Sequence, residues 1–80
     1  AMKRSITIAG HATSISLEPA FWVALEEIAG LNNQPIAALI RQIDEARAAD
    51  TADSYSLSSH IRVYILKHFR DMIPSNNSGG

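Results

Sequence analysis

The stretch Ala12–Leu17, which reads ATSISL, decides how the rest of the chain can fold. Small polar residues alternate here with Ile15 and Leu17, and the alternation stops at Glu18 and Pro19. A period of two residues is typical of a strand with one buried face. Because the chain downstream has helical spacing, the sequence predicts a strand whose partner must come from elsewhere.

The residues just before this strand, 4–9, also alternate and place Ile6 and Ile8 on one face. The apolar residues of the strand that follows have the opposite parity, and Gly10 lies between the two segments. Since glycine commonly marks a turn or a bulge, two structures fit: a bent extended arm, or a local hairpin turning near Gly10 and His11. We favour the arm, because this pair lacks the Asn-Gly or Asp-Gly signal of a tight hairpin.

Two helices are expected directly after the strand. The first begins at Pro19, because proline suits the first helical position, and Gly30 fits its C-terminal cap. The second follows a tight connection, with Asn33 as its cap and Pro35 in its first turn, and runs to about Ala48.

A third helix begins near Leu57 with a serine cap, after a loop at residues 49–56. Val63 and Leu66 widen its apolar stripe, so we expect this helix to be covered on more than one side. Apolar residues recur at helical spacing in all three helices: Phe21, Trp22, Leu25, Ile28 and Ala29; Ile36, Leu39, Ile40, Ile43 and Ala46; and Ile61, Tyr64, Ile65, Phe69 and Met72 or Ile73.

The length and composition bound the class of protein. Eighty residues, 46% of them hydrophobic, make one small domain, which we assign to residues 1–74. Residues 1–3 read as a tag remnant or a flexible arm, and residues 75–80 as a disordered tail. With no cysteine there is neither a disulfide nor a thiolate zinc site, so good packing or oligomerisation must stabilise the fold. We expect a cytoplasmic, dimeric module.

The charge is unevenly distributed. The net charge of −1 argues against a strongly basic nucleic-acid binder. Residues 1–17 nevertheless carry Lys3 and Arg4 and no acid, whereas the middle of the chain is acidic. The strand end is therefore positive, which leaves open an electrostatic footprint at that end of the chain. No apolar run is long enough to span a membrane or to form the core of a signal peptide.

A strand followed by two helices joined by a tight turn has one common solution in a chain that needs a partner. Two copies pair their strands antiparallel across a two-fold axis, and the helices of both chains interlock beneath the ribbon. The outer face of such a two-stranded ribbon fits the major groove of DNA. The expected dimer core consists of Ile15, Leu17, Phe21, Trp22, Leu25, Leu39, Ile40 and Ile43.

At this point the chain resembles the ribbon-helix-helix family of the Arc and methionine repressors, and in particular a group of small bacterial members with a third helix. The resemblance spans roughly residues 4–72. It is carried by Gly10-His11, Thr13-Ser14, Ser16-Leu17-Glu18, Phe21-Trp22, Ile43-Asp44, Leu57-Ser58-Ser59 and Arg62. It implies a mainly α fold, with one N-terminal strand that pairs with its dimer mate and three helices. It also implies a homodimeric DNA-binding module in transcriptional control.

The family's base-reading positions map onto Ala12, Ser14 and Ser16, and its phosphate clamp onto Asn32, Asn33 and Gln34. Free N–H groups at a helix N-terminus attract a phosphate, which supports that clamp independently. Serine discriminates poorly between bases. Three alternatives follow: positively charged side chains outside these positions supply much of the affinity for DNA, the sequence specificity is weak, or the chain binds something other than DNA. The cationic candidates for phosphate contacts are Lys3, Arg4 and His11.

Other candidate sites are weaker. His60 and His68 lie eight residues apart on one helical face, roughly 12 Å by helical rise, which is too far to share one metal ion. Asp44 and Arg62 are a candidate salt bridge between the second and third helices. We find no catalytic set and no phosphate-binding glycine loop, so we expect no enzyme activity, metal or cofactor. The alternative function is an antitoxin-like or scaffold module that uses the same dimer without specific DNA binding.

Overall fold

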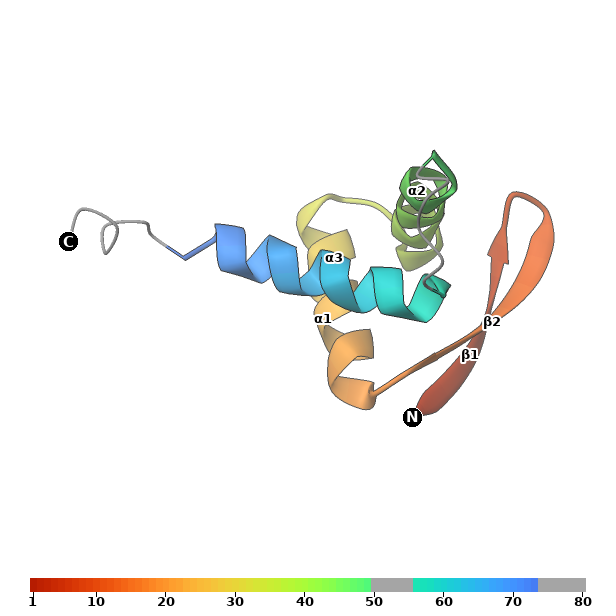
Figure 1. Ribbon diagram of the computed structural model, residues 1–80, viewed down its shortest axis with the longest axis horizontal. Coiled ribbons are helices and arrows are strands. Elements are labelled where there is room, and N and C mark those ends of the chain that lie inside the picture. Colours follow the sequence, from red (N-terminus) through yellow and green to blue (C-terminus); the bar gives the residue numbers. More distant parts are fainter. Residues whose placement is uncertain (50–55, 74–80) are drawn as a thin grey trace.

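A hairpin and three helices make up the fold (Figure 1). The computed structural model describes residues 1–49 and 56–73, so most of the predicted 49–56 loop and the predicted tail lie outside the described residues. The elements follow in the order β1 (Met2–Ile8), β2 (His11–Leu17), α1 (Pro19–Leu31), α2 (Ile36–Ala49) and α3 (Leu57–Asp71).

The N-terminal segment is a local hairpin, and the extended arm predicted for residues 4–9 is wrong. β1 and β2 pair antiparallel along their whole length, from Met2 opposite Leu17 to Ile8 opposite His11. The two residues of the turn, Ala9 and Gly10, have φ angles of 51° and 84°. Two-residue hairpin turns of type I′ require positive φ at both positions. Alanine adopts such an angle only at a cost in free energy, so the Ala9-Gly10 pair is not recognised as a hairpin turn from the sequence.

The register explains the opposite parity of the two alternating segments. In this ladder Arg4 faces Ile15 and Ile6 faces Thr13, so even residues of β1 share a face with odd residues of β2. A two-residue turn therefore brings the apolar residues of both strands to one side. Met2 and Lys3, assigned from the sequence to a tag remnant or flexible arm, belong to β1.

The connection between α1 and α2 also differs from the prediction. Gly30 lies within α1, and Asn33 takes the left-handed position with a φ of 54°. The Asn33 N–H donates to the Gly30 carbonyl at 3.1 Å, and the Gln34 N–H donates to the Ala29 carbonyl at 3.0 Å. This is the hydrogen-bond pattern of a Schellman motif, in which asparagine can replace glycine. Asn33 thus ends α1 instead of capping α2, and Pro35 precedes the first residue of α2.

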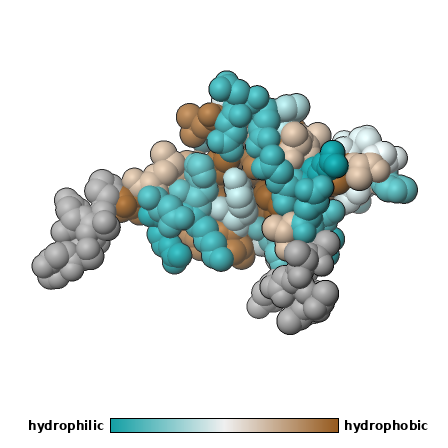
Figure 2. Space-filling view, turned by 90° about the horizontal axis from the view of Figure 1, so that it is seen from above, coloured by the Kyte–Doolittle hydropathy of each residue, from teal (hydrophilic) through white to brown (hydrophobic). Residues whose placement is uncertain are grey.

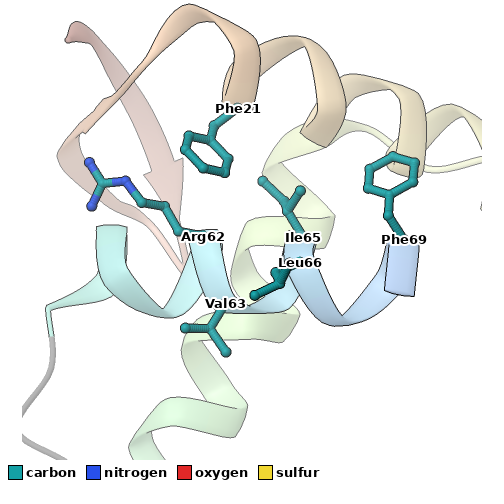
Figure 3. Close-up of a pocket in the computed structure, with 6 residues that line it drawn as sticks. All are labelled: Phe21, Arg62, Val63, Ile65, Leu66 and Phe69. Atoms are coloured by element: carbon teal, nitrogen blue, oxygen red, sulfur yellow. The ribbon is translucent and has the colours of Figure 1, made fainter. Parts of the chain in front are cut away.

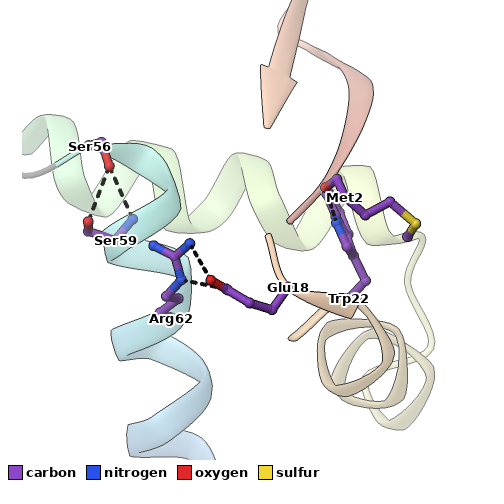
Figure 4. A network of polar contacts seen from close by, with 6 residues as sticks. All are labelled: Met2, Glu18, Trp22, Ser56, Ser59 and Arg62. Atoms are coloured by element: carbon purple, nitrogen blue, oxygen red, sulfur yellow. Dashed lines mark hydrogen bonds and ion pairs between the residues drawn. The ribbon is translucent and has the colours of Figure 1, made fainter. Parts of the chain in front are cut away.

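Serine caps α3, as predicted. The Ser56 hydroxyl accepts a hydrogen bond from the Ser59 N–H, a bond that holds the first turn in place (Figure 4). The predicted salt bridge between Asp44 and Arg62 is wrong. Arg62 instead pairs with Glu18, with 2.9 Å between Nε and Oε1 (Figure 4), and Asp44 pairs with Arg47 one turn away on α2.

The core lies between one face of the hairpin and the three helices, all of which lie on the same side of the hairpin (Figure 1). Trp22, the largest buried side chain, is fully covered, and its indole Nε1 donates to the Met2 carbonyl at 2.8 Å. This bond satisfies the one polar atom of a buried indole. The chain therefore buries a core by itself, made of Ile8, Ile15, Leu17, Trp22, Leu25, Ile28, Ala29, Leu39, Ile40, Ile43, Ile61 and Ile65.

The described part of the chain covers only one side of α3. Ile61 and Ile65 are buried against the core, whereas Leu66 and Ile73 are each 63% exposed. Hydrophobic patches between hydrophilic ones are visible on the surface in Figure 2. The expected second cover of this helix is absent from the described residues.

Candidate nucleic-acid interface

The outward face of the hairpin consists of small polar residues. Lys3 lies opposite Ser16, Ser5 opposite Ser14, and Thr7 opposite Ala12. Ser16 is half-buried and the other five are exposed. Because side chains alternate along a strand, the burial of Ile15 and Leu17 forces Ser14 and Ser16 to point away from the helices.

Sequence reasoning missed half of this face. Ser5 and Thr7 add two hydroxyl groups to those of Ser14 and Ser16, and they come from the strand that was predicted as an arm. The signal was the alternation of residues 4–9, read together with its opposite parity. A single chain thereby provides a two-stranded antiparallel ribbon.

Arg4 lies on the inward side of the ribbon. Its guanidinium sits 4.6 Å from the centre of the Trp22 ring and donates to the Glu26 carboxylate at 2.9 Å. The stacked cation and its ion pair join the hairpin to α1. Arg4 would have to leave Glu26 to reach a phosphate.

Lys3 and His11 are exposed at opposite ends of the ribbon. Lys3 lies beside Ser16, near the strand ends that lead into α1. His11 directly follows the turn. In the described part of the chain, Lys3 is the one fully charged side chain on the outward face.

The three residues predicted to clamp a phosphate lie in the turn before α2. Asn32 and Asn33 are exposed, and the Gln34 amide oxygen accepts a hydrogen bond from Gln42 at 3.0 Å. The first turn of α2 carries no acidic residue. The partial positive charge of this helix end is therefore not neutralised by a neighbouring carboxylate of that turn.

Seven of the eight residues predicted for a dimer core are buried within one chain: Ile15, Leu17, Trp22, Leu25, Leu39, Ile40 and Ile43. The eighth, Phe21, is half-buried and lines an apolar groove beside α3. Contacts within the chain therefore account for the burial of these residues without a second copy.

The histidine face of α3 forms local contacts. His60 Nδ1 lies 3.0 Å from the Ser56 carbonyl, and the rings of Tyr64 and His68 stack with their centres 6.4 Å apart. Within residues 1–49 and 56–73, no cluster of three or more histidine or acidic side chains is placed to hold a metal ion. None of the helices described here is long and apolar enough to cross a membrane.

Comparison with known proteins identifies the fold. The family model of the ribbon-helix-helix domain matches residues 1–69. A solved structure, that of an uncharacterized protein from Bordetella pertussis Tohama I, superimposes with a TM-score of 0.74 at 29% sequence identity. The match covers 94% of this chain and 63% of that protein, which is the longer of the two. The comparison with curated proteins found no match.

Proposed function

The chain belongs to the ribbon-helix-helix family, and on this premise we propose that it is a homodimeric DNA-binding protein that regulates transcription. Domains of this family are typically DNA-binding regulators or antitoxin-like modules, and their fold is not enzymatic. In this proposal the hairpin enters the major groove of DNA, and the protein acts in the cytoplasm of a bacterium.

The observation that carries this proposal is the exposed outward face of the hairpin. The major groove is wide enough for a two-stranded β-ribbon. Hydroxyl groups both donate and accept hydrogen bonds, so Ser5, Thr7, Ser14 and Ser16 can contact base edges or phosphates. The predicted base-facing residues Ala12, Ser14 and Ser16 lie together on this face, and small side chains allow the backbone to approach the bases closely.

Backbone phosphates are contacted by groups around the ribbon. Lys3 lies on the outward face and His11 lies at the turn end of the ribbon. The backbone N–H groups of Asn32, Asn33 and Gln34 donate to α1 carbonyls, so these residues would contact a phosphate through their side chains, beside the N-terminus of α2. α2 also packs against β1, which joins this helix to the ribbon. Arg4 joins these contacts only after it leaves Glu26.

The dimer forms through the free edge of β2. The described sheet has two strands, so each strand has one edge without a strand neighbour. Charged side chains discourage pairing at an edge; β1 carries Lys3 and Arg4, whereas β2 carries no lysine or arginine. Antiparallel pairing of two β2 strands leaves each core intact and places Ser14 and Ser16 of both copies side by side.

Fluorescence anisotropy with short DNA duplexes tests this function. We expect binding that weakens steeply with salt, because phosphate contacts release counterions. Lys3→Ala should reduce the salt slope by about one unit per protein chain, because the alanine cannot neutralise a phosphate. Ser14→Asp and Ser16→Asp should weaken binding at all salt concentrations, whereas Ala20→Asp adds the same charge on α1 and should not.

The absence of binding at about 0.1 mM protein and low salt would reject the proposal, since non-specific affinities of DNA-binding proteins are tighter than this. One observation favours the alternative of an antitoxin-like module. Lys3 is the one fully charged group on the described outward face, because Arg4 lies on the inward side, where it is bound to Glu26. A stoichiometric protein partner whose binding is unaffected by Ser14→Asp would support that alternative.

A further inference from the structure

α3 has a second apolar face beside an open groove. The groove has a volume of about 370 Å³ and is lined by Phe21, Arg62, Val63, Ile65, Leu66 and Phe69 (Figure 3). Val63, Phe69 and Met72 are 44%, 36% and 59% exposed. An apolar face of this kind that is rimmed by polar residues is typical of a contact site.

The remaining parts of this chain do not match that surface in composition. Residues 50–55 and 74–80 read DTADSY and PSNNSGG, and they contain Tyr55 and Pro74 as their only larger apolar residues. A small ligand is also a poor match, because ligand sites contain a few polar groups that fix orientation. The polar group here, the Arg62 guanidinium, already donates to Glu18 at 2.9 Å.

The surface is complementary to itself. It contains both a groove and a protruding side chain, since Leu66 lines the groove and is also 63% exposed. A two-fold axis close to Leu66 would place the Leu66 of one copy in the groove of the other. Such an isologous contact needs both features on one patch of one molecule.

The charges around the groove favour an antiparallel arrangement of the two helices. The C-terminal end of α3 carries Lys67, Arg70 and Asp71 and so has a net positive charge, whereas the Glu18 carboxylate near its N-terminal end is balanced by Arg62. Parallel helices would bring like charges together. Antiparallel helices place the basic end of each copy near Glu18 of the other, which is the more favourable pairing.

We infer that this surface is a self-association interface in which two copies pack their α3 helices antiparallel about a two-fold axis near Leu66. This inference does not depend on DNA binding. Combined with pairing of the β2 edges it gives a tetramer, and without that pairing it gives a dimer. Because one helix of 15 residues is about 22 Å long, the contact is smaller than a standard interface of about 800 Å² per partner. We therefore expect association in the micromolar range.

Sedimentation velocity over a range of concentrations measures this association. Leu66→Ser should raise the dissociation constant of self-association through α3 by about a hundredfold. The reason is that a two-fold interface loses the leucine side chain twice. The control is Val23→Ser, which removes a side chain on α1 that is 56% exposed and does not line the groove. It should leave the dissociation constant unchanged, and circular dichroism should show both variants folded.

A crosslinking measurement locates the axis. Because the chain has no cysteine, Leu66→Cys introduces a single thiol, and mild oxidation should produce a covalent pair. Val23→Cys should remain unlinked. Equal sedimentation of wild type and Leu66→Ser, a wild type that stays monomeric at about 1 mM, or equal crosslinking of both cysteine variants would overturn the inference. Loss of DNA binding with this association intact would overturn only the proposed function.

Discussion

The outward face of the hairpin and the outward face of α3 both point away from the same core, yet they have opposite chemistry. The hairpin presents Ser5, Thr7 and Ser14, whereas α3 presents Val63 and Leu66. Solvent or a polar ligand satisfies hydroxyl groups, but exposed leucine gains only from contact with another apolar surface. This difference supports the proposal of two kinds of contact in two regions: nucleic acid at the ribbon, and protein at α3.

The largest expected effect separates the two faces of β2. Ile15 is 1% exposed and its neighbour Ser14 is exposed. Ile15→Ala should lower the free energy of unfolding by about 2–5 kcal/mol, because it leaves a cavity in the core. Ser14→Ala should change it by less than about 0.5 kcal/mol. Urea denaturation followed by circular dichroism measures both values, and comparable losses would show that the ribbon has no buried face in solution.

The turn of the hairpin gives the next largest effect. Gly10 has a φ of 84° with open space around it, so Gly10→Ala is strained by the backbone alone and should cost about 1–2 kcal/mol. Ala9→Asn should have the opposite sign and stabilise the fold by up to about 1 kcal/mol, because asparagine tolerates the left-handed conformation that alanine resists. If β1 were an extended arm, neither change would alter the unfolding midpoint.

The attachment of the hairpin to α1 should contribute less. Arg4 stacks over Trp22 and pairs with Glu26, while Arg41 pairs with Glu45 on the surface of α2. Arg4→Ala should cost about 0.5–1 kcal/mol in the free energy of unfolding, mostly from the cation–π contact. Arg41→Ala is the control and should cost about 0.3–0.5 kcal/mol. A larger loss for Arg41→Ala would contradict the stacked arrangement.

Features that depend on neighbouring residues could be predicted from the sequence. Local spacing correctly predicted the start of α1 at Pro19, the serine cap of α3 and most of the buried stripes of α1 and α2, because these depend on neighbours within a few residues. In the predicted stripe of α3 only the N-terminal part is buried, since Met72 and Ile73 are exposed, and Ala46 of the α2 stripe is exposed as well. The outward position of Ser14 followed from the period of a strand. The hairpin was considered but not favoured, because Ala9 takes a backbone conformation in the turn that its side chain disfavours.

Features set by the tertiary arrangement could not be predicted in the same way. Gly30 and Asn33 can each take a left-handed cap, and only the length of α1 decides between them. Arg62 could pair with any nearby carboxylate, and the packing of α3 against α1 brings Glu18 to it. Ser5 and Thr7 were missed at the candidate interface because their place on it depends on the pairing of the two strands.

The smallest expected effect is the pH dependence at the rim of the α3 groove. Arg62 donates to the Glu18 carboxylate and holds the pKa of Glu18 below its ordinary value. A lowered pKa in the folded state adds stability above the pKa of the unfolded chain, and this stability is lost as the pH falls through the folded value. We therefore expect the free energy of unfolding to fall below about pH 5, where the glutamate of an unfolded chain begins to take up a proton.

Arg62→Gln should remove this contribution, because a neutral amide no longer favours the ionised carboxylate. The NMR titration of the Glu18 carboxyl should then move up towards its ordinary value, and the acid limb of the unfolding curve should become shallower. Solvent weakens the effect, because about half of the Glu18 side chain is exposed. Identical Glu18 titrations in wild type and Arg62→Gln would contradict the ion pair, and with it the charge arrangement at the rim of the groove.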